Sequence, residues 1–257
     1  SGVGNYVIST FCINKVENLI KSGANPEDIF VIVQWSGIFR KSFISNSSAQ
    51  TGNVNILDCA SNISFGKMKN TSKLCWDVGR HNVTSSYWRN YYDQYWSDEC
   101  AFIETLENIL RLQWFLESKN IKFVMFTGWD IFTIGDDIPS EQKGKRRDIL
   151  SFLRGKKTSA LTNDQWSKKQ YINKENKLMK DEYTWSTHLW EMIDFDKFLF
   201  FDHDNVKYGG LLQWVQHNLK NPNSWYFAEG DTHPSAVGQL QFFKSCIAPE
   251  IKQAFKE

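Results

Sequence analysis

The sequence lacks the features that mark several common classes of protein. No apolar run approaches the ~18 residues of a membrane span, and no charged start followed by an apolar core indicates a signal peptide. No Gly-x-x-x-x-Gly-Lys loop and no dinucleotide fingerprint occur, so no phosphate-cradling loop is predicted. These absences favour a soluble protein without a cofactor and without a membrane partner.

Cysteine is scarce and irregularly spaced. The five cysteines are an odd number, and none forms a Cys-x-x-Cys pair. This pattern disfavours a zinc site and a dense disulfide framework, so we expect mostly reduced thiols and no metal. The Asp202-His203-Asp204 cluster is a candidate metal site. It is only a minor candidate, because adjacent residues of an extended segment point to opposite sides and cannot all reach one ion.

An excess of charge of either sign is also missing. Thirty basic and 29 acidic residues give a net charge of +1, so no global field attracts nucleic acid or an anionic membrane. Seven basic residues and one acid do lie between 143 and 157. They could form an anion-binding patch, but without interleaved aromatic residues a solvated insertion is favoured, and nucleic acid is not predicted as a partner.

Apolar residues are plentiful. Hydrophobic residues make up 41% of the 257 positions and aromatic residues 15%, which argues against disorder and for a folded, aromatic-rich body. A chain of this length commonly forms one α/β domain, so we predict a single domain over residues 1–257.

Periodicity predicts alternating helices and strands. Buried strands are expected at 29–33, 121–126 and 197–201, and helices at 5–22, 97–119, 211–219 and 236–251. A strand, a helix and a strand in this order predict a right-handed parallel crossover. The predicted fold class is therefore α/β, a three-layer α/β/α arrangement with a small, mostly parallel, flavodoxin-like sheet.

Two stretches interrupt this pattern. Residues 41–96 are rich in Asn, Ser, Gly, Tyr and Trp and show no sustained period. A connection of that length is typical of a lid or recognition loop, or it carries short elements that the pattern does not resolve. Its aromatic residues could stack on sugars, although packing onto the body is favoured. Residues 136–185 are predicted to be an insertion.

Near the end of the chain, Asp231 and His233 lie two positions apart at the predicted entrance to a helix. Pro234 and Ser235 follow, and then an apolar-periodic run begins. Such an arrangement can place a catalytic base and the carboxylate that orients it at the start of a helix. The alternative is an ordinary loop or capping contact.

Further candidates follow the predicted strands, where ligand groups of open α/β sheets gather. Ser36 could be a nucleophile or, as favoured, a hydroxyl that caps a turn. Arg40 could clamp an anionic substrate or pair with a local carboxylate. Trp35 and Trp129 are the other predicted substrate-binding residues.

The Asp-x-His-Pro-Ser-x-x-Gly run resembles the last block of the SGNH (GDSL-like) hydrolases, which carries the Asp and His of a Ser-His-Asp triad. The spacing departs from the usual Asp-x-x-His. The turn at Gly2, Gly4 and Asn5 resembles the second block, which implies oxyanion donors there and at Gly37. The third-block Asn is missing, and the Trp-Ser-x-x-x-Arg version resembles a branch of bacteriophage and marine-microbe proteins.

This resemblance implies ester hydrolysis, with removal of an acyl group from a carbohydrate as the expected reaction and with His233 and Asp231 in the triad. The nucleophile is either Ser36 or a serine in an upstream Gly-Asp-Ser block, because a first residue of Ser1 suggests processing or a missing segment. The competing interpretation is a catalytically silent virion or surface protein that contacts neighbouring virion proteins. Location is left open between virion-associated and secreted.

Overall fold

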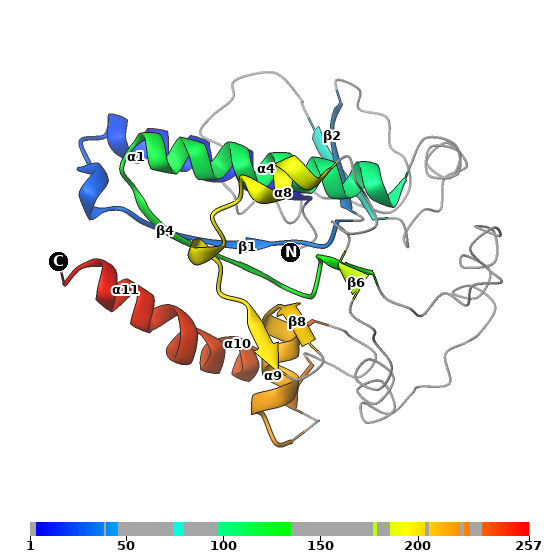
Figure 1. Ribbon diagram of the computed structural model, residues 1–257. Coiled ribbons are helices and arrows are strands. Elements are labelled where there is room, and N and C mark those ends of the chain that lie inside the picture. Colours follow the sequence, from blue (N-terminus) through cyan, green and yellow to red (C-terminus); the bar gives the residue numbers. More distant parts are fainter. Residues whose placement is uncertain are drawn as a thin grey trace.

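The computed structural model describes residues 4–38, 40–45, 74–79, 97–134, 177–178, 186–203, 206–221, 224–226 and 233–256. These residues form a mixed arrangement of helices and short strands (Figure 1). Most of the predicted loop 41–96 and most of the predicted insertion 136–185 lie outside the described residues. The single-domain organisation stays a prediction.

Two parallel strands lie at the centre. β1 (Phe30–Trp35) pairs with β4 (Lys122–Thr127), and Trp35 is the partner of Thr127 at the carboxyl ends. Both strands were predicted from their apolar runs, and their parallel pairing is confirmed. Since parallel strands end at the same edge, the loops after β1 and β4 emerge side by side.

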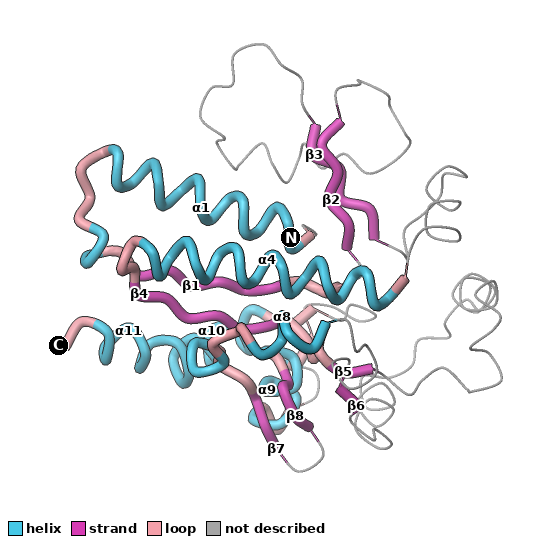
Figure 2. Tube along the Cα trace, turned by 45° about the horizontal axis from the view of Figure 1, so that its top comes forward, coloured by secondary structure: helices cyan, strands magenta, loops and turns pink. Residues whose placement is uncertain are grey.

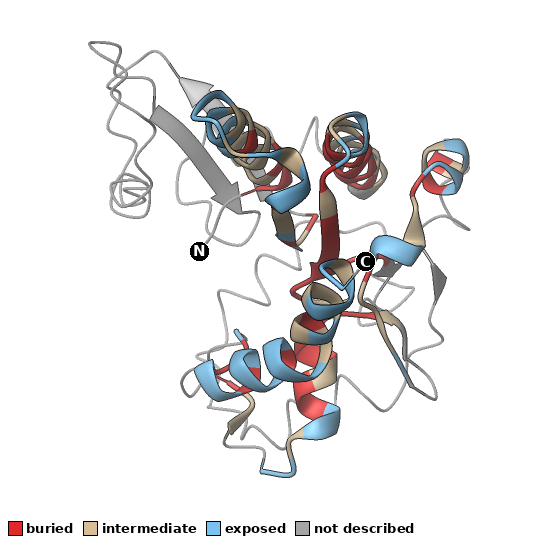
Figure 3. Cartoon of the chain, turned by 90° about the vertical axis from the view of Figure 1, so that its left-hand side faces the viewer, coloured by how far each residue is buried: buried red, intermediate tan, exposed pale blue. Residues whose placement is uncertain are grey.

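Helices cover both faces of this strand pair (Figure 1). On one side, α1 (Asn5–Lys21) and α4 (Asp98–Ser118) pack on β1 and β4 around Val33, Trp35 and Leu106, which are at most 1% exposed. The Ser97 hydroxyl begins α4 by accepting a hydrogen bond from Cys100 N–H at 3.0 Å. Figure 3 shows buried positions on the sides of the helices that face the strands.

On the other side, a smaller core joins β4 to the C-terminal helices. α9 (Leu211–Asn218) and α10 (Ala236–Phe242) bury Val215 and Phe242 against Phe126. The Phe126 and Phe242 ring centroids are 5.1 Å apart. This second core holds the segment that contains His233 against the end of β4.

The predicted final helix is three consecutive pieces. α10 runs into a π-helical turn, η7 (Phe243–Ile247), and then into α11 (Ala248–Ala254). Pro249, near the start of α11, has no N–H and cannot continue the α-helical bonding. Lys122 Nζ donates to the Ala254 carbonyl at the far end, so the last turn is tied to the amino end of β4.

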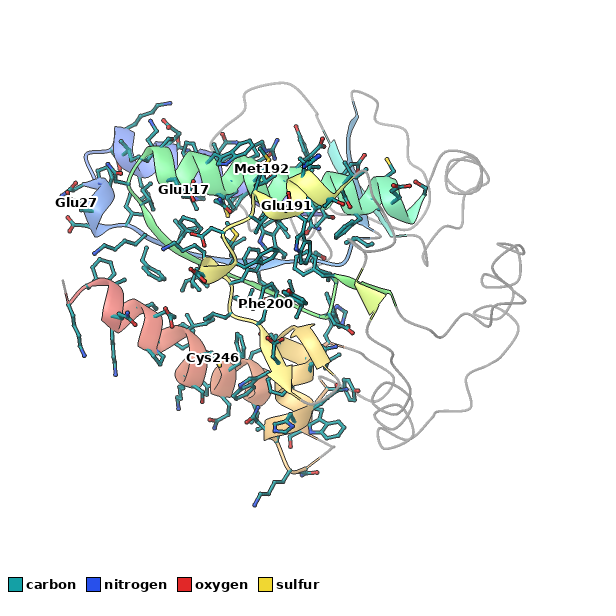
Figure 4. All side chains as sticks on the ribbon, viewed as in Figure 1. Glu27, Glu117, Glu191, Met192, Phe200 and Cys246 are labelled. Carbon is teal, nitrogen blue, oxygen red and sulfur yellow. The ribbon has the colours of Figure 1, made fainter. Side chains whose placement is uncertain are left out.

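The predicted third strand over 197–201 is wrong. Phe198 makes one parallel bridge to Met125, and Leu199 N–H donates to Met125 O at 2.8 Å. β7 (Phe201–His203) then pairs antiparallel with β8 (Val206–Gly209) instead of following β4. Phe198 and Phe200 belong to an aromatic cluster, in which their stacked ring centroids are 5.0 Å apart. Phe200 is labelled in Figure 4.

The remaining described strands are antiparallel, so the mostly parallel sheet is not what these residues form. β2 (Arg40–Ser45) pairs with β3 (Leu74–Gly79), which brings together two parts of the predicted loop 41–96. β5 (Thr133–Ile134) pairs with β6 (Lys177–Leu178) at the ends of the predicted insertion. Each described sheet has two strands.

Candidate functional site

The carboxyl end of β1 is joined to the start of α1 by a side-chain amide. Asn5, 4% exposed, accepts from Ser36 N–H through Oδ1 at 2.9 Å and donates to Ser36 O through Nδ2 at 3.2 Å. Nδ2 also donates to Thr105 Oγ1 of α4 at 3.1 Å. Both hydrogens of the Asn5 amide therefore have acceptors, and the side chain holds the main chain of Ser36 in place.

The start of α1 is uncapped. Gly4 is its N-cap and offers no side chain, and the first turn contains no acidic residue. Within the described residues, the N–H groups of Asn5 and Tyr6 have no acceptor. Unpaired N–H groups and the positive end of the helix dipole thus lie beside Ser36, an arrangement that stabilises negative charge.

Ser36 and Gly37 add two further groups there. The Ser36 residue is 8% exposed, and its hydroxyl makes no hydrogen bond in the described part of the chain. The Gly37 N–H also has no acceptor among these residues, and no atom lies within 4 Å of where a Gly37 Cβ would be. A hydroxyl and a main-chain donor are therefore both uncommitted.

The loop after β4 is braced by the start of α9. Gly128 N–H donates to Trp35 O at 3.1 Å, and Gly128 O accepts from Leu212 N–H at 3.1 Å. Gln213, 7% exposed, donates from Nε2 to Asp130 Oδ1 at 2.9 Å and accepts from Gly210 N–H at 3.0 Å. These contacts hold Trp129 between two anchored neighbours.

His233 lies on Trp129. The two ring centroids are 5.6 Å apart and the ring planes are inclined at 70°, an edge-to-face contact. His233 itself is exposed. The imidazole is therefore presented at the surface beside the carboxyl end of β4, as the sequence predicted for a residue at a helix entrance.

The residues after His233 are anchored by their own contacts. Pro234 bridges to Tyr226, and Ser235 N–H donates to Trp225 O at 2.8 Å. Ser235 Oγ donates to Ser224 O and caps α10 by accepting from Gly238 N–H at 3.0 Å. Packing and capping therefore account for Pro, Ser and Gly in the motif.

The structure brings the predicted residues together in two groups. Gly4, Asn5, Ser36 and Gly37 gather after β1, and Trp129 and His233 gather after β4. No hydrogen bond joins Ser36 to His233. Three further predictions, Gly2, Asp231 and the Arg40 side chain, lie outside the described residues.

The prediction for Trp35 is corrected by the structure. It was predicted to bind substrate, but its side chain is 0% exposed and its Nε1 donates to Met125 Sδ at 3.3 Å. Side chains alternate along a strand, so Trp35, the last residue of β1, points into the core while the preceding Gln34 is exposed. Trp35 is a core residue.

Sequence analysis missed Gln34, the other polar residue at the end of β1. A Cβ on Gly128 would lie 3.0 Å from Gln34 Nε2, so this amide lies against the loop that carries Trp129. Gln34 is exposed, and its side chain makes no hydrogen bond in the described part of the chain. A polar residue ending an otherwise apolar run was the available signal.

Burial changes the chemistry of two of the described cysteines, Cys12 and Cys246. Burial raises the pKa of the Cys12 thiol to about 11 and also raises that of Cys246, so both thiols are neutral at pH 7 and poor nucleophiles. The predicted Asp202 candidate instead accepts from Tyr208 N–H at 2.7 Å. No group of three metal-ligating side chains occurs among these residues.

The Asn5 bridge gives a direct test of this arrangement. Asn5→Ala should lower the free energy of unfolding by about 3 kcal/mol, because it leaves the main-chain N–H and C=O of the buried Ser36 without their hydrogen-bond partners. Asn18→Ala, on an exposed position of the same helix, should change it by less than about 0.5 kcal/mol. Urea denaturation measures both, and equal effects would contradict the bridge.

Nothing among the described helices is long and apolar enough to cross a membrane. Comparisons of the chain with protein-family models, with curated proteins and with solved structures return no match.

Proposed function

We propose that the chain is a serine-type ester hydrolase of the SGNH type, with its site at the carboxyl ends of β1 and β4 and with a three-layer α/β/α architecture. The observation that carries this proposal is the Asn5 bridge. It fixes Ser36 beside the uncapped start of α1, where main-chain N–H groups lack acceptors.

Ser36 is the preferred nucleophile among the described serines. The hydroxyls of most others already make hydrogen bonds: Ser9, Ser22, Ser97, Ser118, Ser224 and Ser235. The Ser36 hydroxyl does not, and it follows a strand at the edge where His233 also lies. A serine outside the described residues remains the second form of the proposal.

The reaction would proceed by two acyl transfers. The serine Oγ attacks the ester carbonyl carbon while His233 takes its proton, and the resulting oxyanion accepts hydrogen bonds from the N–H groups of Asn5 and Gly37. The C–O bond then breaks, and His233 returns the proton to the leaving alcohol. Water, deprotonated by His233, releases the acid and restores the serine.

The histidine would have to reach the serine on substrate binding. His233 is exposed and makes an edge-to-face contact with Trp129. Catalytic hydrogen bonds are often long or absent without substrate and form in the complex. Trp129, which is half-buried, would offer an apolar ring to a sugar face, which fits an acylated carbohydrate as substrate.

The second candidate is a catalytically silent structural protein that uses the same scaffold for contacts in a virion or on a surface. The absence of a Ser36–His233 hydrogen bond favours it. Fold by itself confers no chemistry. The two candidates differ in whether any serine of the chain is reactive.

A fluorophosphonate probe, which reacts with activated serines, distinguishes them. We expect stoichiometric labelling of the full chain and hydrolysis of a chromogenic acetate ester, with the label on Ser36 by peptide mapping. Ser36→Ala should then abolish both, while Ser245→Ala, at an exposed helical serine, should leave both unchanged. Labelling of another serine would assign the nucleophile there, and no labelling with no hydrolysis would establish the silent scaffold.

A further inference from the structure

Gln34 lies on the face of the strand pair that carries the C-terminal helices. It is the partner of Phe126 in the register of β1 and β4, and paired residues of neighbouring strands place their side chains on the same face. Phe126 packs on Phe242 of α10, the helix that follows His233. α10 and α11 lie on the opposite side of the strand pair from α1 (Figure 2). Gln34 and His233 therefore share one face, and the start of α1 lies on the other.

The part of this face that belongs to β1 is accessible. Val124 and Phe126 of β4 are only 3% and 6% exposed. Ile32 of β1, by contrast, is 38% exposed, and Gln34 is exposed as well. The Gln34 amide makes no hydrogen bond in the described part of the chain. An uncommitted donor and acceptor therefore lie beside the proposed site.

Gly128 leaves room for this amide. A Cβ on Gly128 would lie 3.0 Å from Gln34 Nε2, which is closer than an ordinary van der Waals contact. Gly128 immediately precedes Trp129, whose ring makes the edge-to-face contact with His233. The Gln34 amide therefore lies against the main chain next to the ring that His233 touches.

The proposed mechanism places the leaving alcohol on this face. His233 would return the proton to the alcohol oxygen, so that oxygen must come within hydrogen-bond reach of the imidazole. The carbonyl oxygen would lie on the other side, at the N–H groups of Asn5 and Gly37. The rest of the alcohol would then extend over Trp129 and toward Gln34.

We propose that Gln34 and Trp129 form a sugar-binding subsite, in which Gln34 determines specificity by hydrogen bonding to sugar hydroxyls. The assignment of this subsite to the leaving alcohol rests on the proposed function. A carboxamide donates to one hydroxyl and accepts from another, and an indole ring offers an apolar surface to the sugar face. Because the amide is uncharged, the subsite favours a neutral polyhydroxylated alcohol over a charged one.

Binding of methyl glucoside, methyl galactoside and methyl N-acetylglucosaminide tests the subsite without any hydrolysis. Saturation-transfer difference NMR on the full chain should show binding of at least one of these glycosides. Gln34→Ala should raise its dissociation constant about 10-fold, the loss expected for one or two hydrogen bonds. Gln241→Ala, the same substitution at an exposed position of α10, should leave the constant unchanged.

Hydrolysis separates the subsite from the proposed function. For the acetylated form of the bound glycoside, Gln34→Ala should lower kcat/KM about 10-fold through KM, and by a smaller factor for the chromogenic acetate ester, which has no sugar hydroxyls. Sugar binding that weakens in Gln34→Ala without hydrolysis of either ester would support the subsite and exclude the esterase. No sugar binding to the wild type, or binding that Gln34→Ala does not weaken, would overturn the subsite whether or not the chain hydrolyses esters.

Discussion

His233→Ala is expected to reduce kcat for ester hydrolysis by about 1,000-fold, because a general base and acid contributes roughly 10²- to 10⁴-fold. The substitution removes the group that takes the proton from the serine and returns it to the leaving alcohol. KM should change far less, since His233 would act on the proton rather than on the bulk of the substrate. Steady-state hydrolysis of a chromogenic acetate ester measures both constants.

The fold should be unaffected by this change. His233 is exposed, and the anchors of its segment come from Pro234, Ser235 and Gly238. His188→Ala is the control, because the His188 side chain is 94% exposed and makes a long contact of 3.7 Å with Glu191. Activity that survives in His233→Ala, or that falls equally in His188→Ala, would exclude His233 as the base.

Much of the central fold was predictable from local patterns. Most residues of β1 and β4 are apolar, and Ser97 followed by an amphipathic stretch identifies the start of α4. The segment around Phe198 was not predictable in the same way. Its apolar run looks like a strand, but its pairing with β4 is limited to one bridge, between Phe198 and Met125, and such tertiary pairing is not encoded in a local pattern.

The candidate site was predictable in its location and less so in its roles. Residues that follow strands were expected at one edge, and Ser36, Trp129 and His233 do follow β1, follow β4 and precede α10. The role of Asn5 depends on Thr105, 100 positions away, which no local pattern reveals. The prediction that Trp35 binds substrate was wrong because its ring, at the last position of the strand, turns into the core. Gln34 was missed because the preceding position, which it occupies, is the exposed one.

The brace behind Trp129 depends on a glycine, and this gives the second large expected effect. A Cβ on Gly210 would lie 2.5 Å from Thr127 O, 2.6 Å from Thr127 Oγ1 and 2.6 Å from Trp129 O. Two of these three atoms are main-chain atoms at the end of β4, so a side chain cannot be accommodated by a rotamer change. The backbone of Gly210 is extended, with φ of −101°, so the constraint is contact and not conformation.

Gly210→Ala should therefore lower the free energy of unfolding by about 3 kcal/mol, at the upper end of the range for overpacking, and the loss should appear in urea denaturation. Ester hydrolysis should fall as well, because relief of the contact requires the Trp129 loop to move away from α9, and His233 rests on that ring. Gly37→Ala is the stability control, since its Cβ would meet no atom within 4 Å, and it should change the unfolding free energy by less than about 0.5 kcal/mol. If Gly210→Ala were as stable as Gly37→Ala, α9 would not be packed against the end of β4, and Trp129 would not be held where His233 needs it.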